Sequence, residues 1–282
     1  MRRHQGYSLF KIRLMIDYHI HTKLCNHARG VMGAYVRCAI DKGLKEVCFL
    51  DHLTLSEPGN RLSMTPGEVP FYFQAVQNLK NSFDGMISVK AGLEVDFKPE
   101  DKDLVEQIIG TFSFDVIGSS IHFPGNIDIV NSRSDWKQGR YNTEHLYERY
   151  FSRFKTMLEY DYFDVICHLD LPKKFGRKSI KALDRGLDDI IAMIKDKDLT
   201  VELNTSGYNH PVSEAYPAPG IIKKCHTAGV SMTLGSDAHR PEDVGRHFDK
   251  ALPLLRSIGY THLASFTERQ RIDIPIEDLT SD

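Results

Sequence analysis

The hexapeptide Asp17-Tyr18-His19-Ile20-His21-Thr22 decides how the rest of this chain is interpreted. It follows the short apolar run Ile12–Ile16, so we expect both histidines to stand at the end of a strand and to point to the same side. Two imidazoles placed in this way can hold one metal ion. In a chain with 13 histidines such a pair is a weak signal by itself. It gains weight because the ends of nearly all later strands carry comparable residues.

Composition favours a globular enzyme over several other classes of protein. The chain has 282 residues, of which 41% are hydrophobic, enough for one large domain or two ordinary ones. Its 36 Lys and Arg against 38 Asp and Glu indicate neither a nucleic-acid partner nor a membrane surface. The five cysteines form no CxxC pair, which favours free thiols in a cytoplasmic protein over a disulfide framework or a Cys-based zinc site. No apolar run has the length of a membrane span.

The first part of the chain, residues 1–14, is a basic leader, and we assign residues 15–282 to a single catalytic domain. The leader lacks the continuous apolar stretch and the cleavage site of a signal peptide. The organised pattern begins at Met15, which is therefore a candidate for the true start of the protein.

Short runs rich in β-branched residues alternate with stretches of helical periodicity. The expected strands are Ile12–His19, Glu46–Asp51, Ile87–Val95, Phe114–Ile121, Phe163–Cys167, Leu199–Leu203 and Val230–Leu234. The expected helices are Gly33–Lys42, Val69–Phe83, Pro99–Thr111, Thr143–Tyr160, Ile180–Lys197, Ala218–Ala228 and Asp243–Ser257. Near-continuous apolar strands are typical of a parallel sheet that is buried on both faces. Seven such units predict a closed or nearly closed β/α barrel, with a doubly wound sheet as the alternative.

The carboxyl ends of the strands, where a β/α barrel carries its functional residues, are rich in possible metal ligands. The candidates are His19, His21, His27, His52, Glu94, His122, His168, Asp237 and His239. A zinc-type site uses three or four protein ligands, so this set suits two or three ions. Imidazoles mixed with carboxylates favour Zn, Mn or Fe(II) over Mg alone.

Each of these residues has a purely structural alternative. A single histidine at a strand end is more commonly a hydrogen-bonded core residue, and for His27 and His52 the two interpretations are evenly balanced. The metal interpretation is stronger for the two histidines of the hexapeptide and for His239, which follows Asp237. Clustered metal ions activate water and hold phosphoryl oxygens, so the set favours hydrolysis of a phosphate ester.

Seven stretches together resemble the polymerase and histidinol phosphatase (PHP) superfamily, and within it the histidinol-phosphatase branch. They are Asp17–Thr22, Phe49–His52, Ala91–Val95, Gly118–His122, Cys167–Asp170, Glu202–Gly207 and Gly235–Gly245. They occur in the family's order and cover residues 15 to about 250. The resemblance implies a distorted (β/α)7 barrel, TIM-like in architecture, with a trinuclear metal centre.

The resemblance also implies how the ligands divide among the three ions. His19, His21, Glu94 and Asp237 would hold one ion, and Glu94, His122 and His168 would hold a second, so that Glu94 bridges the two. His27, His52 and His239 would hold the third. Asp237 or a neighbouring ligand such as His239 would protonate the leaving alkoxide.

The stretch Glu202–Pro217 resembles the phosphatase branch but departs from it at one position. An Arg that helps to hold the phosphate usually follows Ser-Gly-x, and here Asn209 stands in its place. Basic residues that could still contact the phosphate include Lys174, Arg177 and Arg246. For the ammonium group of histidinol, the candidate carboxylates are Glu57 and Glu68, with Tyr208 and His210 as a wall.

We therefore predict a metal-dependent phosphomonoesterase that hydrolyses L-histidinol phosphate in histidine biosynthesis. Asn209 leaves open a PHP phosphoesterase with another small or nucleotide phosphoester, and a non-catalytic metal-binding module is the alternative of a different class. We expect two or three divalent transition-metal ions (Zn, Mn or Fe), a small-molecule substrate, and neither a nucleic-acid nor a membrane partner. The metal and the oligomeric state are not fixed by the sequence.

Overall fold

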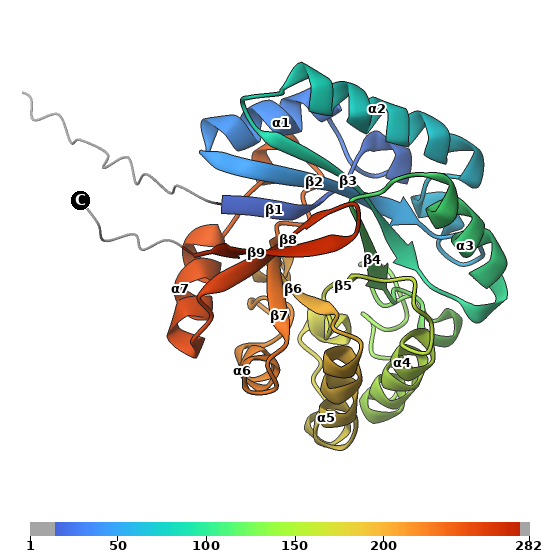
Figure 1. Cartoon of the computed structure of the whole chain (residues 1–282). Coiled ribbons are helices and arrows are strands. Elements are labelled where there is room, and N and C mark those ends of the chain that lie inside the picture. Colours follow the sequence, from blue (N-terminus) through green and yellow to red (C-terminus); the bar gives the residue numbers. More distant parts are fainter. Residues whose placement is uncertain (1–14, 277–282) are drawn as a thin grey trace, which may run out of the picture.

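The computed structural model of the protein describes residues 15–276, apart from the side chains of residues 180–185. The expected leader therefore lies outside the described residues. Seven strands form one parallel sheet in the order β1-β2-β3-β4-β5-β6-β7 (Figure 1). They are β1 (Met15–Ile20), β2 (Leu44–Leu53), β3 (Ser88–Asp96), β4 (Val116–Ser120), β5 (Val165–Ile166), β6 (Thr200–Asn204) and β7 (Ser231–Gly235). This consecutive order confirms the predicted β/α barrel and excludes a doubly wound sheet, in which the strand order reverses.

The barrel closes between its first and last strands through a short contact rather than a full ladder. Ile20 and Ala238 form an isolated parallel bridge. The backbone N–H of His21 donates to the carbonyl oxygen of Ala238 at 3.0 Å, and the N–H of Ala238 donates to that of His19, also at 3.0 Å. The loop after β7 is thereby fixed against the end of β1, where the sequence places the histidine pair.

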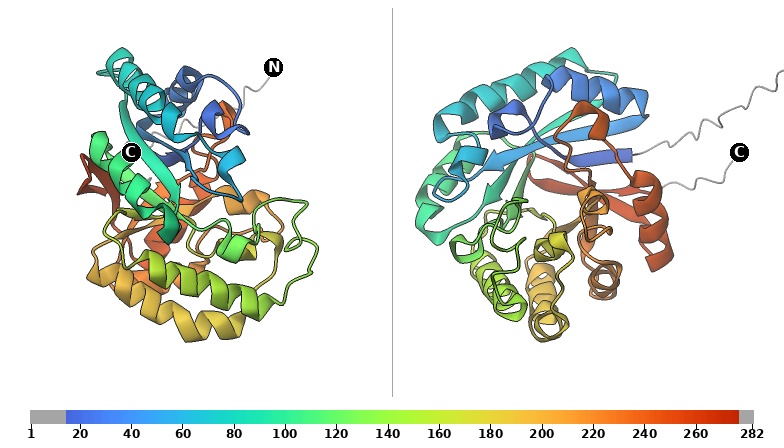
Figure 2. Two further views of the ribbon diagram at one scale, coloured as in Figure 1. Left: turned by 90° about the vertical axis from the view of Figure 1, so that its right-hand side faces the viewer. Right: turned by 180° about the vertical axis from the view of Figure 1, so that it is seen from behind.

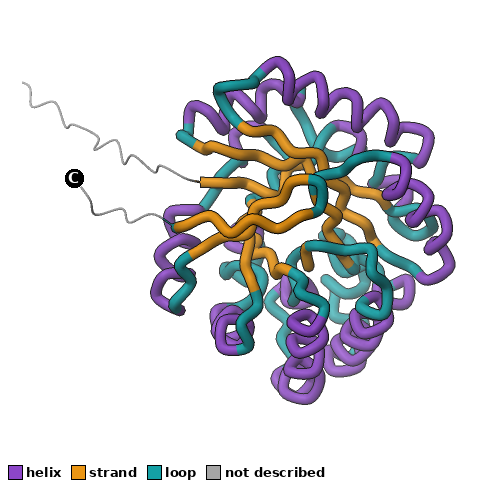
Figure 3. The backbone as a smooth tube through the Cα atoms, in the orientation of Figure 1, coloured by secondary structure: helices purple, strands orange, loops and turns teal. Residues whose placement is uncertain are grey.

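Helices cover the outside of the barrel, as Figures 1 and 3 show. They are α1 (Met32–Asp41), α2 (Val69–Ser82), α3 (Lys102–Thr111), α4 (Thr143–Met157), α5 (Ile180–Asp196), α6 (Pro219–Thr227) and α7 (Phe248–Ile258). Their buried faces carry apolar residues that pack against the sheet. The predicted last helix begins later than expected because Pro241–Asp243 forms a separate 3-10 turn. Within residues 15–276, none of the helices is both long and apolar enough to cross a membrane.

A two-stranded antiparallel hairpin follows α7 and was not predicted. Its strands are β8 (His262–Thr267) and β9 (Gln270–Pro275), and the views in Figures 1 and 2 place it across one end of the barrel. Arg269 in its turn pairs with Asp164 at 3.0 Å, and Lys90 donates to Thr267 at 2.7 Å. Asp164 directly precedes β5, so the hairpin covers the amino-terminal end of the barrel. The carboxyl ends of the strands stay open at the other end.

Candidate metal centre

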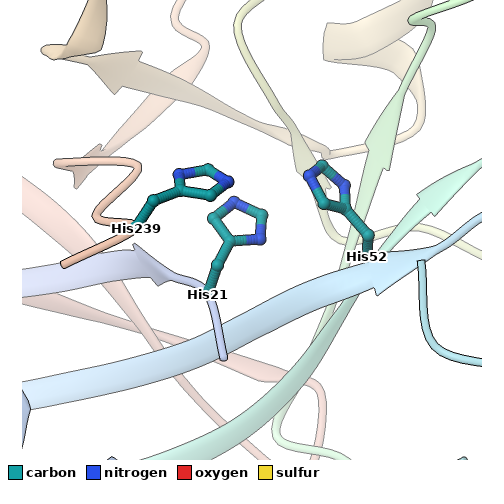
Figure 4. A group of neighbouring side chains, drawn as sticks. All are labelled: His21, His52 and His239. Carbon is teal, nitrogen blue, oxygen red and sulfur yellow. The ribbon is translucent and has the colours of Figure 1, made fainter. Parts of the chain in front are cut away.

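All nine predicted ligands lie at the carboxyl end of the barrel. His19 and His21 come from β1 and its end, His52 from β2 and Glu94 from β3, while His27, His122, His168, Asp237 and His239 come from the loops that follow β1, β4, β5 and β7. Figure 4 shows His21, His52 and His239 converging from three of these elements. The ring centres of His21 and His239 are 4.0 Å apart, and those of His21 and His52 are 4.2 Å apart.

Glu94 is the fully buried carboxylate around which the histidines are arranged. Its Oε1 lies 2.7 Å from Nε2 of His168 and 3.6 Å from Nε2 of His122. Its Oε2 lies 2.7 Å from Nδ1 of His52 and 3.4 Å from Nε2 of His19. Burial favours the neutral acid, but the surrounding histidines outweigh it and hold the pKa of Glu94 well below its usual range. Glu94 therefore stays a carboxylate in the centre of the site.

His27 and His239 present two bare ring nitrogens to each other. Nδ1 of His27 is 2.7 Å from the carbonyl oxygen of Cys25, and Nδ1 of His239 is 3.0 Å from that of Asp237. A carbonyl oxygen only accepts, so the proton of each ring sits on Nδ1 and Nε2 carries a lone pair. The two Nε2 atoms are 2.8 Å apart. Burial and neighbouring histidines lower the pKa of His27 to about 4 and that of His239 to about 3, so both rings are neutral near pH 7. Facing lone pairs at this distance fit a shared cation.

His19 and His21 are oriented in the same way by carboxylates. Nδ1 of His19 is 2.6 Å from Oε1 of Glu202, and Nδ1 of His21 is 3.3 Å from Oδ1 of Asp51. The Nε2 atoms of both rings are buried and form no hydrogen bond with any residue that the structure describes. A carboxylate on one ring nitrogen is the usual device that leaves the other free to bind a metal. The pair His27 and His239 and the pair His19 and His21 therefore both fit divalent transition-metal ions.

Asp237 adds the second carboxylate of the centre. Its Oδ1 lies 3.1 Å from Nε2 of His21 and 3.4 Å from Nδ1 of His239. Its other oxygen, Oδ2, accepts a hydrogen bond from Ser206 at 3.1 Å. Burial favours its neutral form, yet His19 and the other histidines hold the pKa of Asp237 well below its usual range. Oδ1 is thus a charged oxygen directed at the imidazoles.

Ligand atoms within 4.8 Å of one another form several overlapping groups. They include His19 with Glu94 and His168, His19 with His21 and Asp237, His21 with His52 and His239, and Cys25 with His27 and His239. The first two groups agree in part with the sets that the resemblance implies. His239 belongs to two separate groups, one with His21 and His52 and one with Cys25 and His27. The assignment of each residue to a particular ion stays a prediction.

A pocket opens over these ligands toward solvent. Its wall contains Thr54, Gly59, Leu62, Phe123, Val130, Leu171, Lys174, Ser206, His210 and Tyr216. Of the predicted substrate contacts, Lys174 and His210 line this pocket. The ammonium group of Lys174 lies 6.0 Å from the centre of the Phe175 ring and forms no hydrogen bond or ion pair with the described residues, and burial lowers its pKa. A half-buried ammonium group without a carboxylate partner is suited to an anionic ligand.

The other predicted substrate contacts lie outside the lining of the pocket. Arg177 stands over the ring of Trp136, with its guanidinium carbon 5.6 Å from the ring centre. Arg246 donates to Asp243 at 2.8 Å, and Oδ1 of Asn209 is 3.2 Å from Nε2 of His247. Glu57 pairs with exposed Arg61, Glu68 caps the turn at Thr65, and Tyr208 packs against His247. A role for any of them in substrate binding stays a prediction.

Three residues of the centre had no assigned role in the sequence. Glu202 orients His19, whereas Asn204 and Ser206 contact Asp237. The available signal was their alternation along the end of an expected strand, which places them on one face.

The sequence of the PHP domain matches residues 17–206 of the chain. A probable histidinol-phosphatase from Deinococcus radiodurans is 33% identical over 252 residues, which cover 87% of this chain and 94% of that protein. The chain belongs to the PHP family. A histidinol-phosphatase from Lactococcus lactis is 27% identical over 89% of this PHP protein and 94% of its own length. These relatives confirm the predicted enzyme class, a histidinol-phosphatase-like hydrolase.

A solved structure supports the fold. The histidinol phosphate phosphatase of Lactococcus lactis, complexed with zinc, L-histidinol and phosphate, superposes with a TM-score of 0.82 at 24% identity. The match covers 92% of this chain and 99% of that one. The predicted distorted seven-stranded barrel is therefore confirmed as the PHP fold.

We expect protein purified without chelator to contain clearly more than one transition-metal ion per chain. The reason is that bare imidazole nitrogens occur both beside Glu94 and, separately, between His27 and His239. Elemental analysis by inductively coupled plasma mass spectrometry measures the content. One ion or fewer per chain, even after reconstitution with Zn, Mn or Fe, would contradict a multinuclear centre.

Replacement of Glu94 is expected to be more damaging than replacement of His27. Glu94→Ala removes the carboxylate that several histidines share, whereas His27 lies at the exposed edge of the centre. We expect kcat of Glu94→Ala to fall at least about a hundredfold below that of His27→Ala, because a shared charge in a buried site is lost. Steady-state kinetics with parallel metal analysis measures both effects. Equal residual rates at full metal content would show that Glu94 has no such central role.

Proposed function

We propose that this PHP protein is a phosphomonoesterase that uses two or three divalent transition-metal ions, and that L-histidinol phosphate is its substrate in histidine biosynthesis. One observation carries the proposal: five of the predicted histidine ligands, two carboxylates and Lys174 line the same pocket. The relatives named histidinol-phosphatase, at 33% and 27% identity, support the choice of substrate. We place the reaction in the cytoplasm, where the five free cysteines would stay reduced.

Zn, Mn or Fe ions, when bound, lower the pKa of a coordinated water and neutralise phosphoryl oxygens. The side chains of the protein supply the fixed geometry and the additional charge. Glu94 and the carboxylate-oriented rings of His19 and His21 hold fixed geometry in a buried site, so little reorganisation is needed during the reaction. Lys174 adds a positive charge to the wall of the pocket, where it would contact the phosphate.

Asp237 is positioned to transfer a proton from the attacking water to the leaving alkoxide. Its side chain is 19% exposed, whereas that of Glu94, which also lines the pocket, is fully buried. Because its pKa is held low, Asp237 is ionised, so its carboxylate is available to accept a proton from the attacking water and return it to the leaving alkoxide. His239, the alternative donor in the sequence prediction, is 27% exposed beside Asp237, but its pKa is lowered to about 3 and the proton on its Nδ1 is directed at the carbonyl oxygen of Asp237, so Asp237 is the better candidate.

The organic part of the substrate would contact the apolar side of the pocket. Leu62, Phe123 and Val130 contribute this side, and Gly59 packs directly against the Phe123 ring. Burial and nearby Lys174 lower the pKa of His210 to about 4, so this lining residue is a neutral hydrogen-bonding group. Selectivity among phosphomonoesters must come from these groups, since the metal ligands serve any of them.

A PHP phosphoesterase with another small or nucleotide substrate is the second candidate. The lining residues contain no carboxylate other than Glu94 and Asp237, which both face the imidazoles. The ammonium group of histidinol therefore lacks a free carboxylate partner among them. Asn209 stands where the resemblance implies an Arg that holds the phosphate, and this departure also favours a different substrate.

Steady-state kinetics of the metal-loaded protein distinguishes the two candidates. We expect kcat/KM for L-histidinol phosphate to exceed that for a panel of small phosphomonoesters and nucleoside monophosphates. A much higher kcat/KM for another member of the panel would reject histidinol phosphate and leave the phosphoesterase assignment intact. Failure to cleave any member at full metal content would reject the phosphatase itself.

Lys174→Met is expected to weaken catalysis without affecting the fold. A charge-assisted contact to phosphate contributes about 1.5–3 kcal/mol, so kcat/KM should fall roughly tenfold to a hundredfold. Lys178→Met is the matched control, because Lys178 is 46% exposed and pairs with Glu214. Kinetics and thermal unfolding of both variants provide the comparison. If both variants lose activity equally, or neither does, Lys174 does not bind the phosphate.

A further inference from the structure

Strand β6 ends in an alternating polar set that the proposed chemistry leaves without a function. The set consists of Glu202, Asn204 and Ser206, which are 1%, 0% and 5% exposed. Glu202 and Asn204 are two residues apart in the strand and so share one face, which is directed at the metal centre, whereas Ser206 begins the 3-10 turn that follows the strand. Buried polar groups in such a position need partners, and their partners identify what they do.

Both oxygens of Glu202 are fully used, and each contacts a different part of the centre. Oε1 lies 2.6 Å from Nδ1 of His19. Oε2 accepts from the backbone N–H of His168 at 3.0 Å and from Nδ2 of Asn204 at 3.1 Å. One carboxylate thus joins the ligand of β1 to the ligand that follows β5.

The neighbouring strand leaves room for this carboxylate. A Cβ at Gly235 of β7 would lie 2.0 Å from Oε1 of Glu202 and 2.7 Å from Cβ of His19. Any other residue at this position would displace the Glu202–His19 contact.

Asn204 and Ser206 continue the same network to Asp237. Oδ1 of Asn204 accepts from the backbone N–H of Ser206 at 3.0 Å. The Ser206 hydroxyl has one proton, which it donates either to the same Oδ1, 2.7 Å away, or to Oδ2 of Asp237, 3.1 Å away. Nδ2 of Asn204 lies 3.4 Å from Oδ2 of Asp237. With the hydroxyl proton directed at Asp237, two donors face Oδ2, while Oδ1 lies 3.1 Å from Nε2 of His21.

We propose that Glu202, Asn204 and Ser206 are positioning residues that select which atoms of His19 and Asp237 bind metal. Glu202 accepts from Nδ1 of His19 and so keeps its Nε2 bare. Asn204 and Ser206 occupy Oδ2 of Asp237 and leave Oδ1 as the metal-facing oxygen. The inference rests on the proposed function only in taking the centre to be a metal site.

Glu202→Gln tests the first half of this role with almost no change in shape. The amide has one acceptor oxygen, which the N–H groups of His168 and Asn204 already engage, so its NH2 would face Nδ1 of His19. That ring must then accept on Nδ1 and carry its proton on Nε2, which blocks the metal-binding atom. We expect the affinity of the metal-free protein for zinc to fall roughly tenfold to a hundredfold, as measured by competition with a chromophoric chelator.

Asp115→Asn is the matched control for general loss of a buried carboxylate. Asp115 is 3% exposed and accepts from the N–H of Ala91 at 3.0 Å, at the opposite end of the barrel. We expect it to lower the unfolding temperature of the metal-free protein while leaving the zinc affinity unchanged.

Raised zinc concentrations should restore kcat of Glu202→Gln, with KM for the phosphoester close to that of the parent protein.

Ser206→Ala tests the second half, since it removes one donor to Asp237. We expect a smaller loss of zinc affinity, about fivefold, the equivalent of one hydrogen bond. Parental zinc affinity in Glu202→Gln, or an equal loss in Asp115→Asn, would show that the network is merely structural and overturn the proposal. Because the readout is zinc binding, this result is independent of which phosphoester the protein hydrolyses.

Discussion

The placement of the buried carboxylate Glu94 among histidine rings is the constraint on which the rest of the structure depends. An ionised carboxylate without compensating charge would be very costly at this depth. The rings of His52, His122 and His168 that surround it come from three different strands or the loops after them. A closed parallel barrel brings the ends of all its strands to one point. The fold therefore supplies the histidines that compensate the charge of Glu94.

Closure of the barrel depends on the same hexapeptide that supplies the first ligands. Asp17 is fully buried, and its side chain accepts from the N–H of Ser236 at 2.9 Å and from that of Gly245 at 2.9 Å. It thereby holds the loop that carries Asp237 against β1. Asp237 has a left-handed backbone conformation, with φ of +55°, which is uncommon for a residue other than glycine. The contacts around Asp17 and Ala238 are what maintain this conformation next to the ligands.

The strands, and the gathering of the nine candidate ligands at one end of the barrel, were predictable because each depends on a local pattern: an apolar run followed by a residue whose type suits a metal. The substrate contacts were not, since side chains in loops are directed by tertiary neighbours. Arg177 stands in the loop after β5, like Lys174, yet it is taken up by Trp136 while Lys174 lines the pocket. The β8–β9 hairpin was missed because its alternating pattern is short and its role, closing the far end of the barrel, depends on partners such as Asp164.

The charges of the centre are unevenly distributed, and this bears on how a phosphate is held. The inner part contains the carboxylates: Glu202, Glu94 and Asp237 together raise the pKa of His19 well above its ordinary value, although burial opposes this. In the metal-free protein, a second proton would then sit on Nε2 of His19, which faces Oε2 of Glu94 at 3.4 Å, and metal binding at this nitrogen would displace it. The outer part is different, because His21, His27 and His239 are held neutral. Neutral rings do not offset the charge of a cation that they bind, so an ion held by His27 and His239 would keep more of its charge than one held by carboxylates. Because His27 is exposed whereas Glu94 is fully buried, this less compensated charge would lie on the solvent side of the centre, with the carboxylates that fix the geometry behind it.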